Sequence, residues 1–143
     1  LIDSKILDLF SGVGSFGIEC LSRGSKKVVF VENYYGVLPI LKKNLLSLKI
    51  EKNYEILEND IYNDKVLSKL NNKFDIVFLD PPFKDKNLNE FLLKLKNFEI
   101  LSKDGVIIIH RHKDDDDNFS KKFKVVEEKK YGISKISFLT NLN

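Results

Sequence analysis

The sequence has 143 residues, of which 43% are hydrophobic and 31% are charged, so it can form one domain with a buried core but not two. Its apolar runs end after four residues, far short of the roughly 20 that a membrane-spanning helix needs, and its single cysteine excludes an internal disulfide. A net charge of +3 permits an acidic partner such as nucleic acid without requiring one.

Short β-rich segments alternate with longer helical segments along most of the chain. In chain order, we expect a strand over 5–10, a helix over 15–23, a strand over 27–32, a helix over 37–48, a strand over 54–57, a helix over 65–70, a strand over 75–79, a helix around 88–95 and a strand over 106–109. This alternation predicts βαβ units, which place helices on both faces of a parallel sheet.

The pattern changes from about residue 121. The segments 122–131 and 133–139 are both strand-like, with Gly132 between them and no helix, which favours a terminal antiparallel hairpin. The fold class predicted is therefore α/β. We expect a single domain over residues 1–143, with a Rossmann-like, doubly wound, mostly parallel sheet of about seven strands and a C-terminal antiparallel hairpin.

A glycine-rich turn follows the first predicted strand, in the sequence Asp8-Leu-Phe-Ser-Gly12-Val-Gly14-Ser-Phe-Gly17. Such a turn lets a ligand approach the backbone closely at the start of a helix. Glu32 ends the second predicted strand and can accept hydrogen bonds from ribose hydroxyls. Read literally, this is a dinucleotide fingerprint, so the motif alone fits an NAD enzyme as well as any other nucleoside-binding enzyme. The alternative is a tight strand-to-helix turn without a ligand.

Asp60 lies just beyond the third predicted strand. Ligands of doubly wound sheets bind outside the carboxyl ends of the strands, so Asp60 is expected to face the same crevice as Glu32. There it could accept a hydrogen bond from an adenine amino group. Because aspartate is also a favoured N-cap, capping of the following helix is an equally good interpretation.

The motif Asp80-Pro81-Pro82-Phe83 follows the fourth predicted strand. Two prolines fix the backbone and remove two N–H donors, which leaves carbonyl oxygens in set directions. A carboxylate and a rigid carbonyl can together bind an NH₂ group, and the phenylalanine offers a face on which a base can stack. The motif therefore favours chemistry at the exocyclic amine of a nucleobase. The alternative is a proline turn that only ends a strand.

Together these motifs resemble class I S-adenosylmethionine-dependent methyltransferases, and within them the RsmD family, which methylates N2 of a guanine in bacterial small-subunit (16S) ribosomal RNA. The resemblance rests on residues 7–24, 29–32 and 78–83. Gly17-Ile18-Glu19 and Leu21-Ser22-Arg23-Gly24 are more specific to the family than the glycine turn. The resemblance extends from residue 5 to about residue 139.

The resemblance implies a role for each matched residue in an S-adenosylmethionine-dependent methyltransferase. The cofactor-binding residues would be Asp8, Phe10, Gly12 and Gly14 around the methionine part, Glu32 at the ribose with Asn33 beside it, and Asp60 and Ile61 at the adenine. The catalytic residues that hold the target guanine would be Asp80, Pro81, Pro82 and Phe83. The reaction would be an in-line methyl transfer that depends mainly on positioning and needs no metal.

The partner implied is small-subunit ribosomal RNA or the assembled small ribosomal subunit. With no signal-peptide pattern and one cysteine, we expect a cytoplasmic monomer without a membrane partner. The family carries an N-terminal segment that the sequence lacks, so a natural N-terminus is expected to be missing. Cys20 is expected to be buried in the core.

The family usually has a glutamate after the fifth strand, where this chain has His110-Arg111-His112, so no catalytic role is assigned there. A metal site at the two histidines and Asp114 is conceivable but disfavoured. Residues 114–117, four consecutive aspartates, are expected to form an exposed loop that is extended by charge repulsion.

Three other functions remain open. An amino-methyltransferase acting on adenine N6 or cytosine N4, in DNA or another RNA, would use the same motifs. An NAD-dependent oxidoreductase would use the glycine turn and leave residues 80–83 unexplained. An inactive RNA-binding remnant would bind RNA in a salt-dependent way and transfer nothing.

Overall fold

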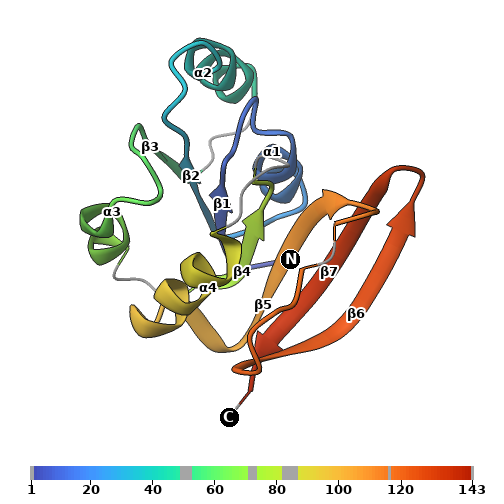
Figure 1. Cartoon of the computed structure of the whole chain (residues 1–143). Coiled ribbons are helices and arrows are strands. Elements are labelled where there is room, and N and C mark those ends of the chain that lie inside the picture. Colours follow the sequence, from blue (N-terminus) through green and yellow to red (C-terminus); the bar gives the residue numbers. More distant parts are fainter. Residues whose placement is uncertain (1, 49–52, 71–73, 82–86, 116, 143) are drawn as a thin grey trace.

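The computed structural model describes residues 2–48, 53–70, 74–81, 87–115 and 117–142. The elements are β1 Lys5–Leu9, α1 Ser15–Ser22, β2 Lys27–Val31, α2 Leu38–Leu46, β3 Tyr54–Leu57, α3 Asp64–Lys69, β4 Phe74–Leu79, α4 Leu88–Asn97, β5 Leu101–His112, β6 Phe123–Tyr131 and β7 Ser134–Asn141. Figure 1 shows this order along the chain. No helix in these described ranges is both long and apolar enough to cross a membrane.

The strands form one sheet in the order β3-β2-β1-β4-β5-β7-β6. The pairs among β1 to β5 are parallel, while β7 pairs antiparallel with both β5 and β6. This is the predicted fold, a mostly parallel doubly wound sheet with a C-terminal hairpin. Because the chain winds outward from β1 in one direction and from β4 in the other, the strand order reverses between these two neighbours. Ligands of such sheets bind at that reversal, beyond the carboxyl ends of the strands.

Each face of the sheet has its own core because side chains alternate along the strands. On one face Ile6, Val28 and Phe30 pack against α1 and α2. On the other, Leu7 and Val29 belong to a larger cluster that includes residues of α3 and α4. Figure 1 shows the two pairs of helices on opposite sides of the sheet. The expected burial of Cys20 is confirmed, since the residue is 2% exposed within the α1 and α2 core.

The fifth strand is much longer than predicted. Its expected span, 106–109, is the apolar centre of a strand that runs from Leu101 to His112. Its first part pairs with β4 across an irregularity in register. Its last six residues, 107–112, pair with β7. Backbone pairing with two neighbours therefore extends the strand through polar residues that carry no hydrophobic signal.

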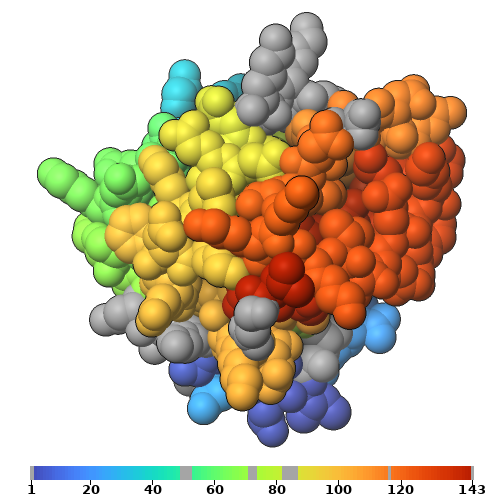
Figure 2. Space-filling view, turned by 60° about the horizontal axis from the view of Figure 1, so that its bottom comes forward, coloured from blue at the N-terminus to red at the C-terminus, as the bar shows by residue number. Residues whose placement is uncertain are grey.

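The C-terminal hairpin is tied to α4 by the segment that leads into it. Asn89 donates from Nδ2 to the carbonyl of Asn118 and accepts at Oδ1 from the N–H of Ser120, at 3.0 Å. Lys96 donates to the carbonyl of Lys122 at 2.9 Å. In Figure 2 the yellow surface of α4 adjoins the orange surface of this segment. The hairpin is thereby held beside β5, whose end contributes to the pocket described next.

Candidate active site

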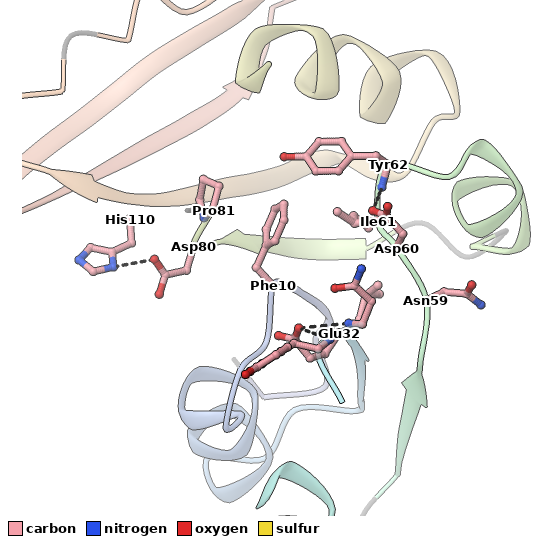
Figure 3. Close-up of a pocket in the computed structure, with 12 residues that line it drawn as sticks. Phe10, Glu32, Asn59, Asp60, Ile61, Tyr62, Asp80, Pro81 and His110 are labelled. Atoms are coloured by element: carbon pink, nitrogen blue, oxygen red, sulfur yellow. Dashed lines mark hydrogen bonds and ion pairs between the residues drawn. The ribbon is translucent and has the colours of Figure 1, made fainter. Parts of the chain in front are cut away.

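A cavity of about 660 Å³ opens at the carboxyl ends of β1, β2, β4 and β5 and the loop after β3. Its lining residues are Phe10, Val31, Glu32, Asn33, Tyr34, Asn59, Asp60, Ile61, Tyr62, Asp80, Pro81 and His110. In Figure 3, Phe10 lies between Asp80 with His110 on one side and Glu32 with Asp60 on the other. The cavity is within the roughly 300–1,000 Å³ that is usual for a small-molecule site. It lies where the reversal of strand order predicts a ligand.

The turn between β1 and α1 has three residues in the left-handed backbone region: Phe10 at φ 57°, Gly12 at 55° and Gly14 at 85°. A side chain at Gly14 would also collide with α2, because its Cβ would lie 2.4 Å from Cδ1 of Leu41. At Gly12 a Cβ would meet no atom within 4 Å, so open space faces the backbone there. For Phe10 the strained conformation goes with a ring that faces the cavity, which is typical of functional sites.

Hydrogen bonds to the Glu32 carboxylate connect this turn to the end of β2. Its Oε1 accepts the N–H of Gly12 at 2.7 Å, and its Oε2 accepts the N–H groups of Asn33 and Tyr34 at 3.1 and 3.0 Å. A carboxylate oxygen has two acceptor sites, so one site on Oε1 is left for a ligand hydroxyl. The carboxylate orientation is therefore fixed before any ligand arrives.

Asp8 lies beneath the turn and does not line the cavity. It is 3% exposed, and its Oδ2 accepts the N–H of Gly17 at 3.1 Å. Burial raises the pKa of its carboxyl from 3.8 to about 8; the hydrogen bond from Gly17 opposes this rise, and the charges of Asp80 and Glu32 add to it. Asp8 therefore holds its proton at neutral pH unless a cation comes near.

The loop after β3 forms the far wall of the cavity. Oδ1 of Asp60 accepts the N–H of Tyr62 at 2.9 Å, which leaves Oδ2 for another donor. The N-cap of α3 is Asn63, whose side chain accepts the N–H of Lys65. The capping interpretation of Asp60 is therefore wrong for α3. The ring of Tyr62 lies 5.9 Å from that of Phe10, so two aromatic side chains share this wall.

Asp80 comes directly after β4 and forms the opposite wall. Its Oδ1 lies 3.1 Å from Nδ1 of His110, and Nε2 of that ring lies 2.8 Å from Oγ of Ser134 on β7. Pro81 is buried beside it. The predicted catalytic residues Pro82 and Phe83 lie outside the described residues.

The cavity thus brings together seven of the predicted site residues: Phe10, Glu32, Asn33, Asp60, Ile61, Asp80 and Pro81. Gly12 and Gly14 shape the turn beside it, and Asp8 lies behind that turn. Sequence reasoning missed Tyr34, Asn59, Tyr62 and His110. A signal for His110 was present. Like Asp80, it is the first polar residue after an apolar run, and such residues of two adjacent parallel strands are expected at the same edge of the sheet.

The aspartate run after β5 differs from its prediction. Arg111 is 5% exposed and binds the carboxylate of Asp117 through two nitrogens at 3.0 and 3.2 Å. The side chain of Lys135 donates to the carbonyl of Asp115. The prediction of an exposed loop extended by charge repulsion is therefore wrong for Asp115 and Asp117, because the buried cations of Arg111 and Lys135 attract these two residues toward the sheet.

The two histidines of β5 have different neighbours. His110 faces Asp80, whereas Nδ1 of His112 accepts the N–H of Asp114 at 3.1 Å. In the part of the chain that the structure describes, no group of three or more histidine, cysteine, aspartate or glutamate side chains converges as a metal site would require.

Comparison with known proteins places the chain within one family. The family model described as "Conserved hypothetical protein 95" matches residues 1–140. The Haemophilus influenzae protein named ribosomal RNA small subunit methyltransferase D is 35% identical over 131 residues, which cover 91% of this chain and 68% of that protein. Its Escherichia coli namesake is 30% identical over 109 residues, covering 76% and 54%. The chain thus spans about two thirds of the first of these two relatives and about half of the second.

Solved structures share the whole fold. A conserved hypothetical protein of Streptococcus pyogenes superposes with a TM-score of 0.87 at 28% identity, covering 99% of this chain and 88% of that one. A structure from Haemophilus influenzae superposes with a TM-score of 0.80 at 33% identity, with the same coverage. The arrangement of the sheet and its helices is therefore common to these proteins.

Proposed function

The chain belongs to the RsmD family of class I methyltransferases, and from that premise we propose that it transfers a methyl group from S-adenosylmethionine to the exocyclic N2 amine of a guanine in small-subunit ribosomal RNA. The observation that carries this proposal is the two-sided cavity. Glu32 and Asp60 line one side of it, to which we assign nucleoside binding, and Asp80 with Pro81 lines the other side, to which we assign the amine. Phe10 lies between them.

The hydrogen-bond acceptors of the first side fit S-adenosylmethionine. The remaining acceptor site on Oε1 of Glu32 suits a ribose hydroxyl, and Oδ2 of Asp60 suits the adenine amino group. The open space in front of Gly12 lets a ligand approach the backbone at the turn. Asp8, which burial keeps protonated at neutral pH, can ionise beside an ammonium group such as that of the methionine part. The cofactor, when bound, supplies a methyl group on a positively charged sulfur.

The second side suits a nucleobase amine. The lone pair of such an amine is delocalised into the ring, so hydrogen bonds from both N–H groups help to localise it on nitrogen. We assign one acceptor to the Asp80 carboxylate and the other to a carbonyl of the rigid Asp80-Pro81 segment. The cofactor would supply the methyl carbon to this nitrogen, and its sulfur would keep the electron pair of the broken carbon–sulfur bond. The nitrogen would then lose one proton to solvent water. Holding the two reactants in line supplies most of the acceleration.

We assign the RNA partner on the names of the curated relatives and on the half-exposed position of Asp80, whose side chain is 50% accessible. A base that is extruded from RNA can reach a carboxylate so placed. The cytoplasm, where ribosomes assemble, is the location that this role requires. We propose that the chain acts as a monomer.

Calorimetric titration tests the cofactor assignment. S-adenosylmethionine and NAD would each be titrated into the wild-type protein and into Glu32→Ala. The proposal expects binding of S-adenosylmethionine alone, weakened at least tenfold by the substitution because the ribose acceptor is lost. Binding of NAD in its place would instead support an oxidoreductase.

Transfer of a labelled methyl group tests the acceptor. Unmethylated small ribosomal subunits, naked ribosomal RNA and DNA would each be offered with labelled S-adenosylmethionine, and Asp80→Ala would be the matched control. The proposal expects label in the ribosomal RNA, which the substitution abolishes. Label in DNA alone would overturn the ribosomal assignment, and cofactor binding without label in any acceptor would favour a non-catalytic RNA-binding protein.

A further inference from the structure

We propose that His110 is a positioning residue for the Asp80 carboxylate and that Ser134 fixes it from behind. This role rests on the methyl transfer proposed above. The residues come from three adjacent elements: Asp80 from the end of β4, His110 from β5 and Ser134 from β7. Figure 3 shows the ring of His110 turned toward Asp80 at the edge of the cavity.

The register of the sheet places Asp80 and His110 next to each other. Leu79 of β4 pairs with Ile109 of β5, so the residues that follow them stand side by side at the carboxyl edge. On the other side of β5, His110 pairs with Ile136. Ser134 lies two residues from Ile136 and therefore points to the same face of the sheet. The ring is thus flanked by a carboxylate and a hydroxyl, at 3.1 and 2.8 Å.

The two partners assign the protons of the ring. A carboxylate oxygen only accepts, so Nδ1 of His110 carries the hydrogen that it donates to Oδ1 of Asp80. When the ring is neutral, Nε2 therefore accepts from the hydroxyl of Ser134, whose proton can rotate toward it. Both ring nitrogens are satisfied in this tautomer, and Oδ2 of Asp80 is left for the substrate amine.

The contact matters because Asp80 would otherwise be poorly fixed. Its side chain is half-exposed, and the terminal torsion of an aspartate is broad and roughly two-fold. A hydrogen bond to one oxygen selects the plane of the carboxylate and so the direction of the other oxygen. Misplacing a positioning group by 1 Å can cost about 10²-fold in rate.

Two near-isosteric substitutions separate the two sides of the ring. In His110→Asn the amide nitrogen stands where Nδ1 was and can still donate to Asp80. In His110→Gln the amide nitrogen stands where Nε2 was and faces Ser134 instead. The matched control is His112→Asn, two residues along the same strand, where the native ring contacts Asp114 outside the cavity.

Single-turnover and steady-state methyl transfer would be measured for these variants and for His110→Ala and Ser134→Ala. We expect kcat to fall about 10- to 100-fold in the alanine and glutamine variants at position 110, with KM for S-adenosylmethionine unchanged. His110→Asn should stay within about threefold of wild type, Ser134→Ala should be intermediate, and the control should match wild type. Equal rates for wild type and His110→Ala, or for the asparagine and glutamine variants, would overturn the inference.

A second measurement does not depend on activity. Nitrogen-15 NMR of the histidine rings reports which nitrogen carries the proton. We expect the Nδ1–H tautomer for His110 in the wild type and its loss in Asp80→Ala; an Nε2–H tautomer in the wild type would overturn the contact. If the wild type bound cofactor but transferred no methyl group, the proposed function would fail and this role with it. If transfer survived His110→Ala, only the positioning role would fail.

Discussion

Replacing Asp8 with asparagine should remove a large pH dependence from the stability of the fold. The carboxyl is 3% exposed, and burial is the main cause that raises its pKa from 3.8 to about 8. Above pH ~4 the carboxyl of the unfolded chain is ionised, whereas the folded chain keeps the proton until about pH 8. The unfolded state therefore binds fewer protons across this window, so the free energy of unfolding decreases as the pH rises.

The size of the decrease follows from the shift. About four pKa units separate the folded and unfolded states, and each unit is worth ~1.4 kcal/mol, which gives a decrease on the order of 5 kcal/mol between pH 4 and pH 8. Asparagine has nearly the same shape and can still accept the N–H of Gly17 through its amide oxygen. Its NH₂ group changes the free energy of unfolding at most by a constant amount that does not depend on pH.

The assay is urea unfolding followed by circular dichroism at several pH values from about 4 to 9, for the wild type and Asp8→Asn. The difference between the two curves cancels the titration of every other group and isolates Asp8. We expect the free energy of unfolding of the asparagine variant to increase relative to that of the wild type by several kcal/mol as the pH rises, with no further increase above pH ~8. Two parallel curves would refute the reasoning, since they would mean that Asp8 titrates alike in both states.

Three further substitutions test the site and its supports. Glu32→Gln should weaken S-adenosylmethionine binding at least tenfold in calorimetry. It should also lower the free energy of unfolding by ~1–3 kcal/mol, because an NH₂ group would then face backbone N–H donors. Unchanged binding would contradict the assigned role. Gly14→Ala should lower the free energy of unfolding, measured in urea, by more than Gly12→Ala does. Both positions have a positive φ, but only at Gly14 would the added Cβ also collide with a leucine of α2, at 2.4 Å. Equal losses would contradict this. Arg111→Ala should destabilise the fold by ~3–5 kcal/mol because it leaves the carboxylate of Asp117 without its two hydrogen bonds, and a loss below 1 kcal/mol would show that the pair contributes little.

Much of the fold could be predicted because its signals are local. The apolar runs 76–79 and 106–109 mark two central strands, and the glycine turn after β1 marks the start of a helix. The ends of β5 could not be predicted, because backbone pairing with β4 and β7 determines them. Such pairing is tolerant of side-chain type, so polar residues such as Ser102 give no sign of it.

The candidate site was predictable where a motif carries chemistry on its own. Glu32, Asp60 and Asp80 each follow a predicted strand, and the sheet brings all three to one cavity. His110 carried only the weaker signal of following an apolar run, and the register then identifies Asp80 as its neighbour. For the same reason the partly buried position of Asp117 depends on its contact with Arg111, which charge repulsion along the sequence could not reveal.

The central claim is that the cavity delivers a methyl group to the N2 amine of a guanine. The most direct test is nucleoside analysis of unmethylated small ribosomal subunits after incubation with the protein and S-adenosylmethionine, with Asp80→Ala run in parallel. The account predicts that N2-methylguanosine appears with the wild type and is absent with the variant. A methyl group found on adenine N6 or cytosine N4, or N2-methylguanosine formed equally by the variant, would contradict it.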